Sequence, residues 1–121
     1  MKKYGVLIVG TGWVSGEHIR AFNMNPHAKV VGIVSRDENR GTAKAKQFGA
    51  SEAIIYTDYD KALENPDINI VCICTPNHLH AEQTIKAAQA GKHILIEKPI
   101  ALTWADAKAM KAAVDKAGVK T

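Results

Sequence analysis

The sequence predicts an α/β fold in which helices cover both faces of a doubly wound parallel sheet. Short β-rich runs alternate with longer helical stretches along the whole chain. The first β-rich run, Tyr4 to Val9, is apolar rather than alternating, as is typical of a strand buried on both faces. Regular alternation of strands and helices demands right-handed crossovers and a parallel sheet with helices on both faces. A glycine-rich turn directly after the first strand favours the strand order 3-2-1-4-5.

The elements expected in the first half of the chain end at recognisable stop signals. The first helix ends before Asn25-Pro26, because proline cannot donate the next helical hydrogen bond. The second helix ends at Gly49, a residue suited to the left-handed conformation past a helix end. We expect, in order, a strand at Tyr4 to Val9, a helix at Val14 to Met24, a strand at Lys29 to Val34, a helix at Asn39 to Phe48 and a strand at Ile54 to Tyr56.

The second half of the chain continues this alternation. Ile68 to Cys74 is the most hydrophobic run and predicts a central strand. Thr103 and Asp106 form a T-x-x-D capping box at the start of the last helix, and Val119 to Thr121 resembles the opening of a truncated sixth strand. The expected elements are a helix at Tyr59 to Glu64, a strand at Ile68 to Cys74, a helix at His78 to Ala90, a strand at His93 to Glu97 and a helix at Thr103 to Ala117.

Length and composition indicate one globular domain over residues 1–121, with 46% apolar and 23% charged residues. The net charge is +4, but the basic residues are scattered, so a nucleic-acid partner is not expected. The longest apolar run, Ile70 to Cys74, is far shorter than the roughly 20 residues of a membrane span. The start of the chain mimics a signal peptide only as far as Gly10, so we expect a cytoplasmic protein.

No metal site is predicted. Cys72 and Cys74 lie in an apolar run at a spacing unsuited to a disulfide between them, and we expect them to be core residues. His78 and His80, two residues apart, would face different ways on a helix. The remaining histidines, at positions 18, 27 and 93, are assigned to core or surface roles.

Gly10-Thr11-Gly12-Trp13-Val14-Ser15 matches the G-x-G-x-x-G/A pattern of dinucleotide-binding turns, with Ser15 at the third small position. Gly10 would permit the tight turn, and Gly12 would let a pyrophosphate approach the backbone at the positive end of the helix. The pattern follows an apolar strand and opens a helix, which is the context that supports this interpretation. The alternatives are a tight turn without a ligand and, for Trp13, an aromatic wedge between the helix and a neighbouring loop.

The end of the second strand discriminates between NAD and NADP. An acidic residue there would bind the ribose hydroxyls, whereas a 2′-phosphate requires hydroxyl or cationic groups. Ser35-Arg36 at this position favours NADP, because arginine binds phosphate bidentately. NAD remains an alternative, since Asp37 would either turn back to the ribose or pair with Arg36 or Arg40.

Two further segments follow strands whose carboxyl ends border the ligand crevice of this fold. Thr75-Pro76-Asn77 leads into a helix that Asn77 or His78 would cap, with His80 close behind. Glu97-Lys98-Pro99 follows the fifth strand. The Lys98 ammonium would hydrogen-bond a substrate oxygen and stabilise the alkoxide that develops during hydride transfer, which makes Lys98 the candidate catalytic residue. The alternative role for Lys98 is an ion pair with Glu97 or another carboxylate.

With these motifs, the sequence resembles the glucose–fructose oxidoreductase, inositol dehydrogenase and rhizopine-catabolism (Gfo/Idh/MocA) oxidoreductases. The resemblance covers essentially the whole chain, and its most specific part is the Glu-Lys-Pro element, since the glycine turn is shared with many families. The motifs that carry it are Gly10-Thr11-Gly12, Thr75-Pro76-Asn77-His78-Leu79-His80-Ala81-Glu82, and Glu97-Lys98-Pro99 followed by Ile100-Ala101-Leu102-Thr103.

The resemblance implies the Rossmann domain of an NAD(P)-dependent dehydrogenase or reductase acting on a sugar, a polyol or a related compound. Lys98 would correspond to the family's active-site lysine, which contacts the substrate hydroxyl and the nicotinamide ribose. Pro76, Asn77 and His80 would line the cofactor near its ribose and nicotinamide ends. Glu97 would help to hold that end of the groove.

Members of this family continue into a second domain that carries a catalytic histidine and most of the substrate pocket, and this sequence contains no such domain. The isolated chain is therefore expected to bind nucleotide without turnover. The edge beside the fifth strand would expose apolar surface and favour homo-oligomers. Alternative functions are a stand-alone nucleotide sensor without catalysis, and the same fold with another nucleotide such as S-adenosylmethionine or coenzyme A.

Overall fold

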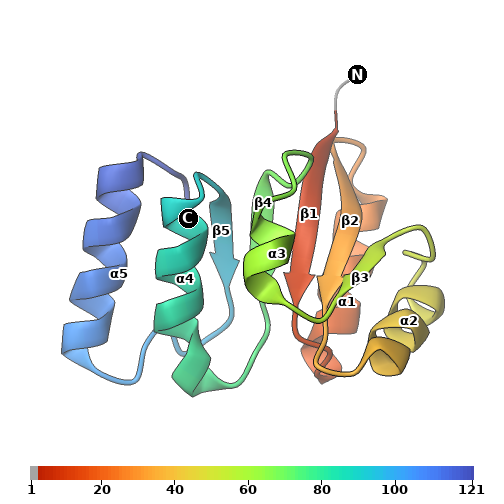
Figure 1. The fold of residues 1–121 in the computed structure, drawn as a ribbon, viewed down its shortest axis with the longest axis horizontal. Coiled ribbons are helices and arrows are strands. Elements are labelled where there is room, and N and C mark those ends of the chain that lie inside the picture. Colours follow the sequence, from red (N-terminus) through yellow and green to blue (C-terminus); the bar gives the residue numbers. More distant parts are fainter. Residues whose placement is uncertain (1–2) are drawn as a thin grey trace.

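A computed structural model of the chain describes residues 3–121. It contains one sheet of five parallel strands in the order β3-β2-β1-β4-β5, which confirms the predicted order (Figure 1). The strands are β1 (Tyr4–Val9), β2 (Ala28–Val34), β3 (Ile54–Tyr56), β4 (Ile70–Ile73) and β5 (His93–Ile96). The helices are α1 (Trp13–Met24), α2 (Glu38–Gln47), α3 (Tyr59–Leu63), α4 (His80–Gln89) and α5 (Trp104–Ala117), together with a short 3-10 helix, η1 (Asn77–Leu79).

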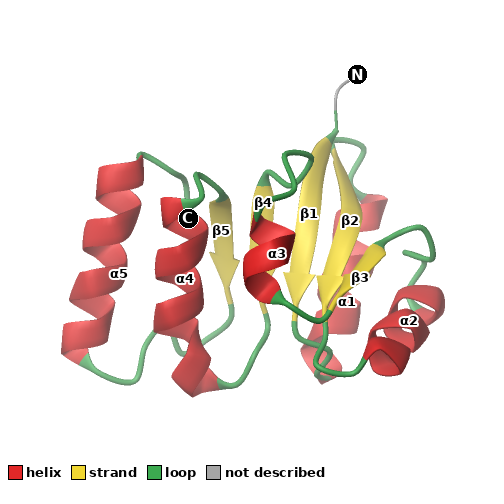
Figure 2. Ribbon diagram, in the orientation of Figure 1, coloured by secondary structure: helices red, strands yellow, loops and turns green. Residues whose placement is uncertain are grey.

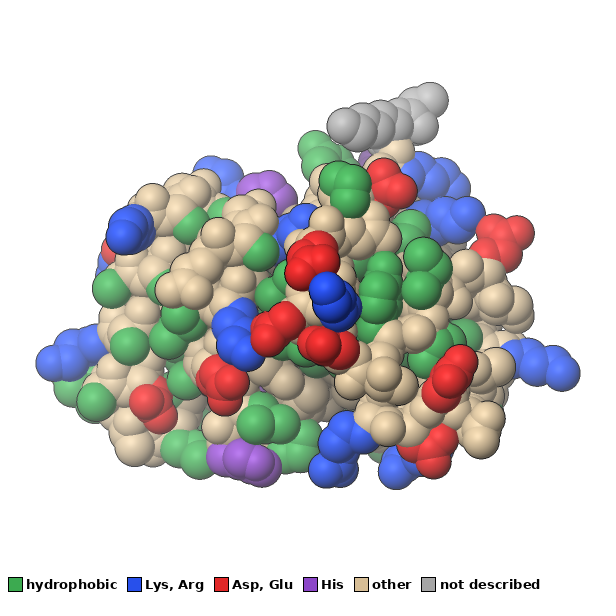
Figure 3. Space-filling model, viewed as in Figure 1, with side chains coloured by type: hydrophobic (Ala, Val, Ile, Leu, Met, Phe, Trp, Pro, Cys, Tyr) green, Lys and Arg blue, Asp and Glu red, His purple; other side chains and the backbone are tan. Residues whose placement is uncertain are grey.

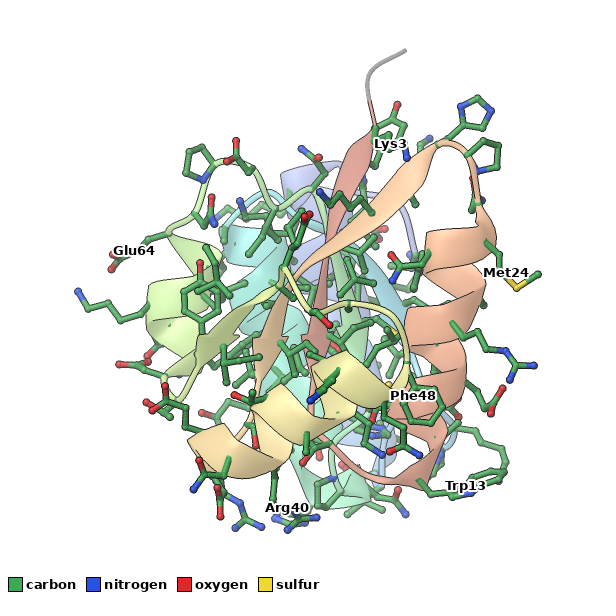
Figure 4. The ribbon with its side chains drawn as sticks, turned by 90° about the vertical axis from the view of Figure 1, so that its right-hand side faces the viewer. Lys3, Trp13, Met24, Arg40, Phe48 and Glu64 are labelled. Carbon is green, nitrogen blue, oxygen red and sulfur yellow. The ribbon has the colours of Figure 1, made fainter. Side chains whose placement is uncertain are left out.

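Alternate side chains of the central strand β1 enter two separate cores. Val6 and Ile8 pack with residues of α1 and α2 on one face of the sheet. Leu7 and Val9 pack with residues of α3 and α4 on the other face. Figures 2 and 4 show α1 and α3 on opposite sides of the sheet. Burial on both faces explains why β1 is apolar throughout rather than alternating.

Two predicted elements differ from the observed ones. The strand expected at Ile68 to Cys74 is reduced to β4, because the Ile68 N–H donates to the Asn65 carbonyl in a turn, although Ile68 is buried. The helix expected from His78 opens instead with η1, in which the Leu79 N–H donates to the Pro76 carbonyl. Within the described residues, no side chain caps η1 or α4, so the expected capping by Asn77 or His78 is wrong.

The last helix begins as its capping motif predicts. The Thr103 hydroxyl accepts a hydrogen bond of 3.1 Å from the Asp106 N–H, and α5 starts at Trp104. After α5, the Ile94 N–H donates to the Lys120 carbonyl at 2.9 Å, and Val119 packs against the core shared with α4. Among the residues that the structure describes, the predicted sixth strand is thus represented by one backbone hydrogen bond to β5.

The face of the molecule over α3 and α4 carries interspersed acidic and basic side chains (Figure 3). Lys86 forms ion pairs there with Asp60 at 3.0 Å and with Glu82 at 3.5 Å. These pairs are exposed and each contributes little to stability. No helix within residues 3–121 combines the length and apolar character that a bilayer crossing requires.

Candidate nucleotide-binding site

The two glycines of the β1–α1 turn have different structural requirements. Gly10 has φ +100°, and a Cβ added there would lie 3.0 Å from the Cys74 carbonyl oxygen. Gly12 has φ −66°, and the nearest atom to an added Cβ would be the same oxygen at 4.0 Å. The fold itself therefore requires glycine at position 10. At position 12, glycine leaves open space above the backbone, where a ligand can approach.

The N-terminus of α1 presents unsatisfied backbone donors to this space. Within residues 3–121, no side chain caps the helix, and the Ser15 hydroxyl donates to the Gly12 carbonyl at 2.6 Å. Ser15 is fully buried, as expected for the third small position of the motif. The next residue, Gly16, was not singled out in the sequence, yet a Cβ there would lie 2.4 Å from the Phe48 ring. Gly16 therefore lets Phe48, at the end of α2, pack closely on α1.

A pocket of about 450 Å³ lies over the turn and extends to the end of β2. Trp13 at its rim is 86% exposed, so it does not act as a wedge against a neighbouring loop. Figure 4 shows Trp13 and Arg40 along the same edge of the molecule. The lining residues are Thr11, Gly12, Trp13, Val14, Ser35, Arg36, Asp37, Arg40, Cys74, Thr75 and Pro76.

At the end of β2, two polar side chains form hydrogen bonds with the backbone, whereas two arginines face the pocket without an ion-pair partner among residues 3–121. The Ser35 hydroxyl is buried and donates to the Asp37 carbonyl at 2.6 Å. The Asp37 carboxylate caps α2 by accepting from the N–H groups of Asn39 and Arg40 at 2.9 and 3.2 Å. Both arginines that border the pocket, Arg36 and Arg40, are exposed, and neither forms an ion pair within the described part of the chain.

The loop after β4 contributes Thr75 and Pro76 to the pocket, whereas Asn77 is exposed on η1 outside its lining. His80 is fully buried. Its Nδ1 lies 2.7 Å from the Pro99 carbonyl oxygen, and its Nε2 lies 2.9 Å from the Thr75 carbonyl oxygen. His80 therefore joins the two loops that follow β4 and β5 and does not itself line the open pocket.

The loop after β5 holds Glu97 and Lys98 apart from the pocket lining. Glu97 Oε1 lies 2.7 Å from His18 Nε2, and Oε2 accepts from the Lys98 backbone N–H at 3.2 Å. The contact with His18 holds the pKa of the Glu97 carboxyl below its usual value. The Lys98 side chain is exposed and forms no ion pair among residues 3–121, so the alternative pairing with Glu97 is not observed.

The sequence analysis gave His18 only a core or surface role and mentioned Arg40 only as a partner for Asp37. The Glu97 partner of His18 lies 79 residues away, which no local pattern reveals. The available signal was helical spacing, because His18 follows the buried Ser15 by three residues and so shares its face of α1. For Arg40, the available signal was its place on the first turn of α2, four residues after Arg36.

His18 also lies beside the two cysteines of the central sheet. A ring nitrogen of His18 and the Sγ atoms of Cys72 and Cys74 lie within 4.8 Å of one another, and the two Sγ atoms are 3.7 Å apart. Both cysteines are buried. The hydrogen bond with Cys74, together with burial, raises the pKa of the Cys72 thiol.

A larger depression of about 580 Å³ lies between β5 and α5. Its lining is mostly apolar and includes Leu95, Ile100 and Trp104, which are 42%, 62% and 76% exposed. This depression lies apart from the glycine turn. It lacks the backbone donors and the two arginines that make the smaller pocket suited to a nucleotide.

Comparison with known proteins gives a consistent result. Residues 4–121 match an oxidoreductase family described as having an NAD-binding Rossmann fold, Gfo/Idh/MocA. The chain is 38% identical to 1,5-anhydro-D-fructose reductase from Ensifer adhaerens, in an alignment that covers 98% of this chain and 34% of the relative.

Solved structures agree with this match. The WlbA dehydrogenase from Bordetella pertussis, in complex with NADH and UDP-GlcNAcA, is 33% identical with a TM-score of 0.88. A 3-ketoreductase from Actinomadura kijaniata, in complex with NADP and TDP-benzene, is 27% identical with a TM-score of 0.89. Each alignment covers 98% of this chain and 36% of the other protein.

The chain thus spans about a third of the length of these relatives. Within that third, the strand order, the open Gly12, the uncapped start of α1 and the pocket reaching the end of β2 fit a nicotinamide dinucleotide. The chain belongs to the Gfo/Idh/MocA oxidoreductase family and corresponds to its NAD(P)-binding Rossmann domain.

Proposed function

We propose that this chain is the cofactor-binding part of an oxidoreductase that moves a hydride between a nicotinamide and a carbinol or carbonyl carbon of a sugar, a polyol or a related compound. The observation that carries the proposal is the pocket over Gly12, which lies at the carboxyl ends of the parallel strands, as does the loop of Lys98. Relatives of the chain are named as a sugar reductase and a levoglucosan dehydrogenase, which supports this substrate class.

Each group of candidate site residues has a defined part in this proposal. The backbone N–H groups at the start of α1 would bind the pyrophosphate, helped by the positive end of the helix. Thr75, Pro76 and Asn77 would border the ribose on the nicotinamide side. The Lys98 ammonium would donate to the substrate oxygen and stabilise the alkoxide as the carbinol carbon loses its hydride. The bound nicotinamide supplies the hydride acceptor, and the hydroxyl proton leaves to a base outside this chain.

We further propose that the cofactor is NADP. The side chain of Asp37 is committed to capping α2, which leaves Arg36 and Arg40 as the charged groups at the end of β2. Two guanidinium groups bind a 2′-phosphate strongly, whereas a ribose diol prefers a carboxylate acceptor. Ser35 contributes less than its sequence position suggests, because its hydroxyl is buried and already bonded to Asp37.

The test is a titration of the chain with NADPH and NADH, followed by fluorescence, with S-adenosylmethionine and coenzyme A as competitors. We expect saturable binding of NADPH that is tighter than binding of NADH and is not displaced by the other two nucleotides. We also expect no steady-state oxidation of polyols by these 121 residues. A folded chain that binds neither dinucleotide would refute the proposal. Catalytic turnover by the chain alone would contradict its assignment as a cofactor-binding part.

We also propose that copies of the chain associate in the cytoplasm. Leu95, Ile100 and Trp104 expose apolar surface beside β5, at the edge of the sheet, and such a surface favours self-association. Two free cysteines in the core are common in reducing compartments. Sedimentation over a range of concentrations would show a concentration-dependent dimer, and a strictly monomeric profile would refute the association.

A further inference from the structure

The loop that carries Lys98 is anchored on both sides of that residue. The side chain of Glu97, directly before it, contacts His18. The carbonyl of Pro99, directly after it, contacts His80. Lys98 is itself exposed, so the position of its backbone depends on these two neighbours.

The first anchor connects the loop to the helix of the glycine turn. His18 lies on α1, and its Nε2 is 2.7 Å from Glu97 Oε1. The other oxygen of the same carboxylate accepts from the Lys98 N–H at 3.2 Å. Both side chains are only about one-quarter exposed, at 24% for His18 and 27% for Glu97, so solvent weakens the contact less than at an open surface. Glu97 therefore connects α1 with the backbone of Lys98.

The second anchor fixes the same loop to the end of β4. The two ring nitrogens of the fully buried His80 contact the carbonyls of Pro99 and Thr75. Because water does not reach His80, nothing replaces these contacts when the loop moves. The far side of the Lys98 loop is thereby fixed, and its placement relative to the glycine turn depends on the His18 contact.

We propose that His18 is a positioning residue for Lys98: acting through Glu97, it sets the place of the lysine relative to the pyrophosphate end of the same groove. This inference rests on the proposed function, since it assumes that a dinucleotide extends from Gly12 to Lys98. His18 lies outside the lining of the pocket, so its effect on the ligand is indirect, and its contact with Glu97 transmits that effect to the loop of Lys98. The nicotinamide half of the cofactor would be affected, and the adenosine half would not.

The experiment compares the unmodified chain with His18→Ala, the conservative His18→Gln and the control His27→Ala. The side-chain amide of glutamine provides an N–H donor for Glu97, whereas the alanine side chain provides no donor. His27 is an exposed histidine in the turn before β2 and lies outside the lining of the pocket. Each protein is titrated with NADPH and NADH, and with their adenosine halves, adenosine 2′,5′-bisphosphate and ADP. Hydrogen exchange at the Lys98 amide is measured in parallel by NMR.

We expect His18→Ala to weaken binding of the preferred dinucleotide about tenfold and to accelerate exchange at Lys98, because a charge-assisted contact is lost. Binding of the matching adenosine half would change less than about twofold, and His18→Gln would recover most of the loss. Unchanged dinucleotide binding and exchange in His18→Ala would overturn the inference. Equal weakening of both ligands would also overturn it, because that result indicates a general structural role. If the unmodified chain binds neither dinucleotide, the proposed function fails first.

Discussion

At the glycine turn, the residues that shape the site are neighbours in the sequence, whereas at the Lys98 loop they come from elements far apart along the chain. Gly10, Gly12 and Ser15 lie within six residues and on one strand–helix junction. The Lys98 loop depends on His18, which is 79 residues from Glu97, and on His80, which is 19 residues from Pro99. The motif at the first end of the groove is therefore local in sequence, although the Cys74 carbonyl that restricts position 10 comes from β4's end, whereas at the second end even the positioning residues are far apart in sequence.

The largest effect is expected from Gly10→Ala, which tests how much the glycine turn contributes to the stability of the fold. Alanine at φ +100° is strained, and its Cβ would lie 3.0 Å from a backbone oxygen, so we expect a loss of about 2–4 kcal/mol in the free energy of unfolding. Denaturant unfolding measures this loss. The matched control is Gly49→Ala, since Gly49 has φ +86° and no atom of the described chain lies within 4 Å of an added Cβ. Equal losses in the two variants would show that the close contact contributes nothing.

Gly12→Ala should separate binding from stability at the same turn. Because φ at Gly12 is −66° and an added Cβ has room, we expect a loss of stability below about 1 kcal/mol. The methyl group would occupy the space assigned to the pyrophosphate, so dinucleotide affinity should fall by about 2 kcal/mol, roughly thirtyfold. Calorimetric titration of the folded variant measures this change. Unaltered affinity would place the pyrophosphate elsewhere.

The double variant Arg36→Ala and Arg40→Ala tests the part of the pocket proposed to bind the 2′-phosphate of the adenosine half. Removing two charge-assisted contacts should lower the affinity for NADPH by about 1.5–3 kcal/mol. NADH lacks the 2′-phosphate, so its affinity should change much less. The ratio of the two dissociation constants is the quantity to measure. A ratio that both substitutions leave unchanged would contradict the proposed preference for NADP.

The smallest expected effect is on the free energy of unfolding, through Glu97 in the loop of Lys98, and it depends on pH. Glu97 has a lowered pKa in the folded chain, mainly because of His18, so its stabilisation is complete above the unfolded pKa of about 4.3 and is lost as the pH falls through the folded value. The unfolding free energies of the unmodified chain and Glu97→Gln should therefore differ by less than about 1 kcal/mol at neutral pH and converge as the pH falls through the folded pKa of Glu97. A difference that grows on acidification would have the wrong sign.

The sequence predicted the fold well because the relevant patterns are local. Apolar runs, the stop at Asn25-Pro26 and the cap at Thr103 place the elements within a few residues of their observed bounds. The main error, at Ile68, arose because a buried apolar residue in a turn has the same pattern as a strand residue.

For the candidate site, sequence reasoning identified the glycine turn and the loop of Lys98 and left their connections unseen. His80 was expected to line the cofactor, yet both of its ring nitrogens contact backbone carbonyls inside the protein. The commitment of the Ser35 hydroxyl to Asp37 also depends on loop geometry that residue type does not specify. Residue types indicated which residues are candidates for the site, and the contacts that position those residues required the three-dimensional structure.

The most direct measurement is a crystal structure of this chain grown or soaked with NADP, with NAD as a parallel experiment. The account predicts a diphosphate bound to the N–H groups at the start of α1, above Gly12, with the nicotinamide directed toward Lys98. A well-ordered dinucleotide bound elsewhere, with the turn at Gly12 free of ligand, would contradict it.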